Sequence, residues 1–169
     1  MAAGKPHKLL ATGSRAPDFR LQRLDGGEVA LRDLTSTGAA LLAFFKVTCP
    51  VCQLAFPFLE RIHAGGGAKG AGGALLVYGI SQHPARDTRD FNREFSITFP
   101  TLLDTEEGGY PVSNAFGISQ VPSIFLVEHD GKISRVVEGW SKKDMEWLGG
   151  KAGVSVFRRG DSVPESKPG

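Results

Sequence analysis

Hydrophobic residues follow three patterns in the first half of the chain. Apolar and polar residues alternate over 19–31, around a Gly-rich turn at 25–27, and predict a β-hairpin. Two continuous apolar runs, AALLAFFKV at 39–47 and ALLVYGIS at 74–81, predict strands that are buried on both faces of a sheet. Between these runs, over 50–63, apolar residues recur at helical spacing and predict a helix.

Prolines and glycines refine the prediction for this helix. Pro50 suits its first turn, where a missing N–H costs nothing. Pro57 lies inside the helix, where it removes one backbone hydrogen bond and predicts a kink. The glycine-rich stretch AGGGAKGAGG at 64–73 predicts the end of the helix and a loop.

The second half of the chain continues the alternation of helices and strands. The pattern predicts a helix at 84–95, a strand at 99–104, a helix at 110–118, a hairpin at 123–138 and a helix at 141–148. A crossover makes the two buried strands parallel neighbours, and the closing hairpin adds antiparallel strands. The sequence therefore predicts an α/β fold, a central mixed β-sheet flanked by helices, with an N-terminal β-hairpin.

The length of 169 residues suits one domain with a substantial core. We expect this domain over 16–150, after a lead-in at 1–15 and before a C-terminal tail at 151–169. The end of the tail is polar and rich in proline and glycine, which predicts an extended or disordered segment.

Composition narrows the range of partners. The chain has 20 Lys and Arg against 18 Asp and Glu, a net charge of +2, and no block of like charge. This pattern predicts binding to neither nucleic acid nor a membrane surface. The N-terminus shows no apolar signal-peptide core, and the longest apolar run is too short to span a bilayer. We therefore expect a cytoplasmic protein, and we expect it to be a monomer.

Both cysteines of the chain lie in the stretch FFKVTCPVC, directly after the first buried strand. Cys49 falls at the start of the predicted helix, where unpaired N–H groups and the helix dipole favour an anion. Cys52 lies one turn further in and should be more shielded, yet close enough to attack a mixed disulfide on Cys49. Lys46 either adds positive charge near this pair or is an ordinary solvated lysine at a strand end.

A resemblance to a known family joins these residues to a distant proline. FFKVTCPVC after a buried strand, Pro57, and Val121-Pro122 before the strand SIFLVE together resemble the thioredoxin superfamily. The similarity is greatest to its redoxin branch, which contains the alkyl hydroperoxide reductase/thiol-specific antioxidant type and the thiol:disulfide oxidoreductases of cytochrome maturation. It covers residues 16–148 and implies a thioredoxin-like fold.

The resemblance also implies roles for individual residues. Pro122 would follow a cis peptide bond and lie against the cysteine pair, and the backbone of Val121 would pair with a bound peptide. The alternative for Pro122 is an ordinary proline at a strand start. Pro50 belongs to the dipeptide between the cysteines, which sets the reduction potential.

The chain departs from the family pattern around the cysteines. Thr48 stands where the family usually has Trp. Ala43 and Ala55 stand where relatives carry a buried acid that accepts the proton of the second cysteine. His83, Lys46 or water would have to replace that acid. His83 lies at the C-terminal end of a strand, where such sheets place ligands, although it could equally be a surface histidine at a helix start.

Three other readings of the cysteine pair stay open. A peroxiredoxin-like thiol peroxidase that reduces hydroperoxides would carry Thr or Ser three residues before its reactive cysteine and Pro four before that, but Lys46 and Leu42 stand there. A zinc site would need further ligands, and the four histidines show no paired spacing. A redox-inert binding module would leave both thiols simply packed.

The residues and the resemblance together predict a thiol–disulfide oxidoreductase with antioxidant activity. Cys49 attacks a substrate disulfide, and Cys52 resolves the mixed disulfide. We expect no metal and no cofactor beyond the reversible Cys49–Cys52 disulfide. The expected partners are protein or small-molecule disulfides and thiols, with a recycling thiol system such as thioredoxin or glutathione.

Overall fold

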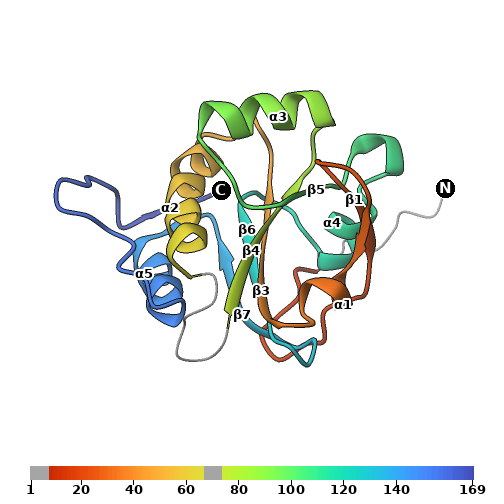
Figure 1. Ribbon diagram of the computed structural model, residues 1–169, viewed down its shortest axis with the longest axis horizontal. Helices are drawn as coiled ribbons and strands as arrows, with labels where there is room; N and C mark the ends of the chain where they lie inside the picture. The colour runs from red at the N-terminus through yellow and green to blue at the C-terminus, as the bar shows by residue number, and fades with distance from the viewer. Residues whose placement is uncertain (1–7, 67–73) are drawn as a thin grey trace.

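A seven-stranded mixed β-sheet forms the centre of the molecule (Figure 1). The computed structural model describes residues 8–66 and 74–169. The strands of this sheet are β1 (Arg20–Arg23), β2 (Glu28–Ala30), β3 (Gly38–Phe45), β4 (Ala74–Ser81), β5 (Thr101–Leu103), β6 (Ser123–Val127) and β7 (Ile133–Glu138). Their spatial order is β2-β1-β5-β4-β3-β6-β7. A separate small sheet joins β8 (Trp140–Ser141) to β9 (Ser166–Lys167).

The pairing directions agree with the pattern of hydrophobic residues. β3 pairs with β4 in parallel, as expected for two buried strands linked through a helix, and β4 pairs with β5 in parallel. β1–β2 and β6–β7 are antiparallel hairpins. The predicted central mixed sheet and the N-terminal hairpin are therefore confirmed.

Helices surround the sheet. They are α1 (Leu31–Leu34), α2 (Pro50–Gly66), α3 (Ala85–Glu94), α4 (Pro111–Phe116) and α5 (Lys142–Lys151), with a 3-10 turn η1 (Glu106–Gly108) before α4. In Figure 1, α5 lies beside α2, which it contacts. α2 contains Pro57 and ends at Gly66, later than the predicted end at His63. The rest of the predicted loop, 67–73, lies outside the described residues.

Neighbouring phenylalanines show how the core fills both faces of the sheet. Phe44 and Phe45 follow one another in β3, so their side chains point to opposite faces. The Phe45 ring centroid lies 4.4 Å from that of Phe56 in α2, and the Phe44 centroid lies 5.2 Å from that of Phe116 in α4. Both rings of β3 are fully buried. Helices on both faces thus explain why this strand is a continuous apolar run.

The two ends of the chain pack against the domain. Backbone N–H groups of Leu10 and Gly13 donate to the carbonyls of Phe116 and Ile133, at 3.1 and 2.8 Å. In the tail, the Phe157 ring lies 5.1 Å from the ring of Phe58. The residues that the sequence sets apart as lead-in and tail therefore contribute contacts to the fold where they are described.

A buried aspartate joins the end of β5 to the start of α4. Asp104 accepts hydrogen bonds from the backbone N–H groups of Val112 and Ser113, at 3.1 and 2.6 Å, and from the Ser113 hydroxyl at 2.6 Å. Tyr110 occupies the N-cap position, and its side chain makes no capping bond. Asp104 therefore supplies the acceptor that the first turn of α4 needs.

We predict that Asp104→Asn destabilises the protein by about 1–3 kcal/mol, because an amide nitrogen cannot accept these buried hydrogen bonds. Urea unfolding would measure the free energy of unfolding. Asp25→Asn is the matched control, since the Asp25 side chain is 75% exposed. Equal stability of the two variants would contradict the capping role.

Candidate active site

The sulfur of Cys49 occupies the position of a helix N-cap acceptor. β3 ends at Phe45 and α2 begins at Pro50, so Cys49 is the residue directly before the helix. Its carbonyl accepts the first helical bond, from the N–H of Gln53 at 3.1 Å. The N–H of Cys52, at the third helical position, donates to the Cys49 sulfur over 3.1 Å. A Ser or Asp oxygen usually takes this place, and here the N–H stabilises negative charge on sulfur.

The two thiols differ in exposure. Both cysteines are free, with Cys49 partly exposed and Cys52 completely buried. Burial raises the pKa of the Cys52 thiol well above its ordinary value, and its hydrogen bond with Cys49 adds to this rise. A hydrogen bond with the backbone of Lys46 offsets a part of this rise in pKa. Cys49 is thus accessible to a substrate, while Cys52 stays protonated inside the fold.

The loop before β6 completes the site. The peptide bond between Val121 and Pro122 is cis. The Cys49 thiol donates to the Val121 carbonyl at 3.4 Å, across a sequence separation of 72 residues. The Pro122 carbonyl accepts from the N–H of Gly139 at 2.8 Å, which ties this loop to the segment after β7. The structure therefore brings together the cysteine pair and the dipeptide that the resemblance singled out.

Three of the four remaining sequence-predicted residues line a cavity of about 910 Å³, which reaches the cysteine loop at Thr48. Lys46, Thr48 and His83 reach it from the C-terminal ends of β3 and β4. Pro50 is the first residue of α2 and does not line this cavity. The backbone of His83 is hydrogen-bonded to the side chains of Ser81 and Thr88, and among the described residues no hydrogen bond joins the His83 imidazole to Cys52.

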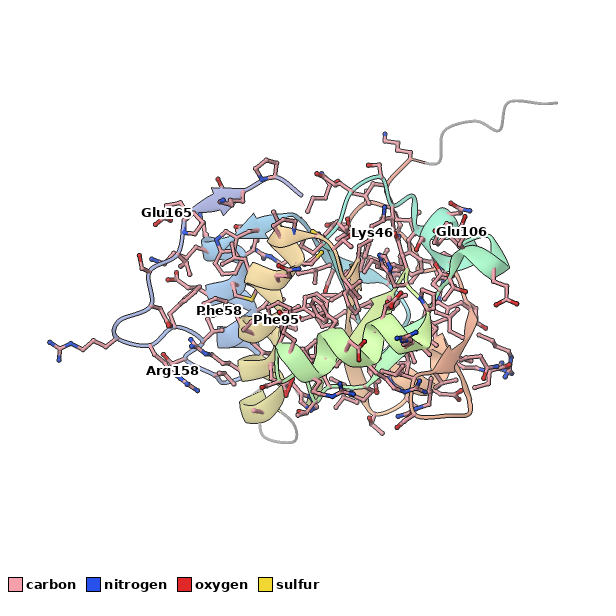
Figure 2. The ribbon with its side chains drawn as sticks, turned by 90° about the horizontal axis from the view of Figure 1, so that it is seen from above. Lys46, Phe58, Phe95, Glu106, Arg158 and Glu165 are labelled. Atoms are coloured by element: carbon pink, nitrogen blue, oxygen red, sulfur yellow. The ribbon has the colours of Figure 1, made fainter. Side chains whose placement is uncertain are left out.

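Other lining residues carry no signal in the sequence. Glu106, Glu107 and Tyr110 enter the cavity wall from the turn between β5 and α4. Figure 2 labels Lys46 and Glu106, two of the charged residues of this wall. Because these residues meet Lys46 only through the fold, a reading of local spacing misses them. The cavity therefore presents both a cation and carboxylates next to Thr48.

The described residues, 8–66 and 74–169, contain no group of three or more His, Cys, Asp and Glu side chains placed to hold a metal ion. In that part of the chain, every helix is too short or too polar to cross a membrane.

We predict that iodoacetamide at neutral pH modifies the reduced protein once, at Cys49, because Cys52 is buried and its pKa is raised. Mass spectrometry of tryptic peptides would locate the adduct. In denaturant both cysteines should react, which serves as the control. Equal labelling of the two thiols in the native protein would contradict the asymmetry.

Comparison with known proteins places this site in a family. The model of the AhpC/TSA family matches residues 12–136. Thiol-disulfide oxidoreductase ResA of Geobacillus thermodenitrificans is 29% identical over 135 residues, which cover 80% of this chain and 74% of the relative. The ResA protein of Bacillus subtilis is 29% identical over 143 residues, covering 85% of this chain and 75% of the relative.

Solved structures share the fold. A thiol:disulfide interchange protein from Bacteroides sp. superposes with a TM-score of 0.71 at 23% identity, over 86% of this chain and 93% of that one. Peroxidoxin BcpB from Mycobacterium tuberculosis superposes with a TM-score of 0.64 at 22% identity, over 83% of this chain and 92% of that one. The predicted thioredoxin-like fold is thereby confirmed. From the match over residues 12–136, the chain belongs to the AhpC/TSA family, in the redoxin branch of the thioredoxin superfamily.

Proposed function

We propose that this protein is a thiol–disulfide oxidoreductase whose redox centre is the pair Cys49 and Cys52. The observation that carries the proposal is the asymmetry of the pair at the start of α2. The Cys49 sulfur is partly exposed and accepts the N–H of Cys52, whose own thiol is buried. Relatives named thiol-disulfide oxidoreductase ResA support the same chemistry.

The reaction uses only the sulfur atoms and a proton. In the reducing direction, the Cys49 thiolate attacks one sulfur of a substrate disulfide, and the other sulfur leaves as a thiolate that takes up a proton. The Cys52 thiol then loses its proton and attacks the Cys49 sulfur. The Cys49–Cys52 disulfide forms, and the substrate leaves as its second thiol. The reverse sequence oxidises a dithiol, and in either direction the pair works without a further cofactor.

Proton removal from Cys52 limits the second step. Ala43 and Ala55 are fully buried at the positions where related proteins carry an acid, so neither can accept this proton. Lys46 and His83 line the neighbouring cavity. We assign proton transfer to water that enters that cavity, with the imidazole of His83 as the group that receives the proton. The Lys46 ammonium has no free lone pair to accept it and can only stabilise the thiolate that forms.

The proposed substrates are protein and small-molecule disulfides or thiols. The backbone of Val121 beside Cys49 offers a place for an extended peptide, as in strand addition. The cavity next to Thr48 offers space for a small molecule. A thioredoxin or glutathione system is the proposed source or acceptor of electrons. The cytoplasmic location and the monomeric state expected from the sequence stay predictions.

We predict a two-electron redox transition of the Cys49–Cys52 pair, between about −270 and −120 mV, the range that this kind of centre covers. Titration in dithiothreitol or glutathione buffers, with alkylation and mass measurement, would give the midpoint. Cys49→Ser should abolish the transition. If the wild-type pair fails to titrate, disulfide exchange is wrong; if it turns over hydrogen peroxide rapidly and reacts with no disulfide, the peroxidase reading takes its place.

We further predict that resolution by Cys52 accelerates with pH. Because its pKa is raised, the thiolate fraction should grow about tenfold per pH unit through the ordinary cysteine range and should not level off by pH 8.5. Stopped-flow release of 2-nitro-5-thiobenzoate from a mixed disulfide on Cys49 would measure this rate. Cys52→Ala is the control, which should hold the mixed disulfide at every pH. A plateau below pH 8 would contradict ionisation of Cys52 as the limiting event.

A further inference from the structure

We propose that the chain's own segment Glu165–Gly169 occupies the edge on which polypeptide substrates dock, so that it competes with them for the site. This inference rests on the proposed function, because it assigns the Val121 backbone to peptide binding. It also defines a substrate preference: small disulfides reach Cys49 freely, whereas an extended polypeptide must first displace the segment.

The preceding part of the tail anchors the segment close to the site. The Arg61 guanidinium pairs with Asp161 at 2.6 Å, and this hydrogen bond lowers the pKa of the Asp161 carboxyl. The indole N–H of Trp140 donates to the Pro164 carbonyl at 2.6 Å. Trp140 is fully buried, so the anchor at residue 164 is firm. Residues 165–169 follow this anchor directly.

Those residues lie along the segment after β7 in an extended conformation. The Lys142 N–H donates to the Glu165 carbonyl at 2.9 Å. β9 then pairs antiparallel with β8, with Ser166 opposite Ser141 and Lys167 opposite Trp140. β8 directly follows Gly139, whose N–H holds the Pro122 carbonyl. The segment therefore adds a strand beside the loop that carries Val121.

The end of the segment reaches the carbonyl that faces Cys49. A Cβ placed on Gly169 would lie 2.5 Å from the Val121 oxygen and 3.0 Å from the Val121 carbonyl carbon, which leaves space for glycine alone. That same oxygen lies 3.4 Å from the Cys49 sulfur. Figure 1 shows the C-terminal end beside α2 and β6, and Figure 2 shows the tail returning toward the start of α2. A bound peptide that pairs with Val121 would need this place.

The segment is held lightly enough to be displaced. Residues 165–169 are all exposed. The ion pair between Lys142 and Glu165 spans 3.8 Å, and the Glu165 side chain is 85% exposed. This ion pair therefore adds little to the stability with which the segment is attached. A two-stranded pairing of this kind is marginal by itself. The segment stays on this edge mainly because the anchor at Pro164 keeps it close. The anchor gives the segment a high effective concentration at the edge.

The experiment compares a polypeptide disulfide with a small one on the same reduced protein. Insulin and hydroxyethyl disulfide are the two probes, and the readout is the single-turnover rate of Cys49–Cys52 oxidation. Gly169→Val removes the fit at Val121 in the full-length chain, and a variant that ends at Pro164 removes the segment. Ser162→Val is the matched control, since Ser162 is an exposed tail residue before the anchor. Thermal unfolding checks that each variant is folded.

We expect both variants to reduce insulin at least about threefold faster than wild type. The chain that ends at Pro164 loses the two cross-strand pairs of β8 and β9, and Gly169→Val loses the close approach to the Val121 carbonyl. Their rates with hydroxyethyl disulfide, and both rates of Ser162→Val, should equal those of wild type. Unchanged or slower insulin reduction would overturn the inference, as would an equal acceleration with both probes. Failure of the proposed function looks different, because then wild type and all variants would react with neither disulfide.

Discussion

The site depends on one hydrogen bond, from the N–H of Cys52 to the sulfur of Cys49. This bond starts α2 with a sulfur acceptor in the place where most helices use an oxygen. It therefore couples the folding of the helix to the chemistry of the pair. The same bond fixes the separation of the two residues. It also makes them unequal, because the acceptor sulfur of Cys49 lies at the exposed end of the helix while Cys52 lies in the core.

Burial of Cys52 follows from the position of α2 on the sheet. The rings of Phe45 and Phe56 pack against each other at a tilt of 47° across the interface between β3 and α2, and Ala43 and Ala55 are fully buried. A thiol in this apolar setting keeps its proton, since the charged form would lose its solvation. In the proposed mechanism, the partly exposed Cys49 is therefore the nucleophile, and the buried Cys52 must lose its proton before it can resolve the mixed disulfide. The cavity beside Thr48, with Lys46 and His83 in its wall, is the route that we propose for that proton.

The two sides of Cys49 differ in what they offer a substrate. On one side lies the open cavity beside Thr48, with charged groups of both signs. On the other side lies the Val121 carbonyl, approached by the backbone of Gly169. This approach is closer than simple coverage of the surface requires. In our proposal this position makes the choice of substrate depend on the segment that Trp140 and Pro164 hold beside the site.

Local patterns in the sequence determined the hairpin, the two buried strands, the helix after the cysteines and the unequal exposure of Cys49 and Cys52, because each depends on residues a few positions apart. Pairing of Val121 with Cys49 could be expected only through the family resemblance, since 72 residues separate them. Tertiary structure alone decided the capping of α4 by Asp104, the entry of Glu106 into the cavity wall and the return of the tail to Val121. These contacts join segments that are distant in the chain, and their side chains follow no periodicity that would reveal where the fold brings them.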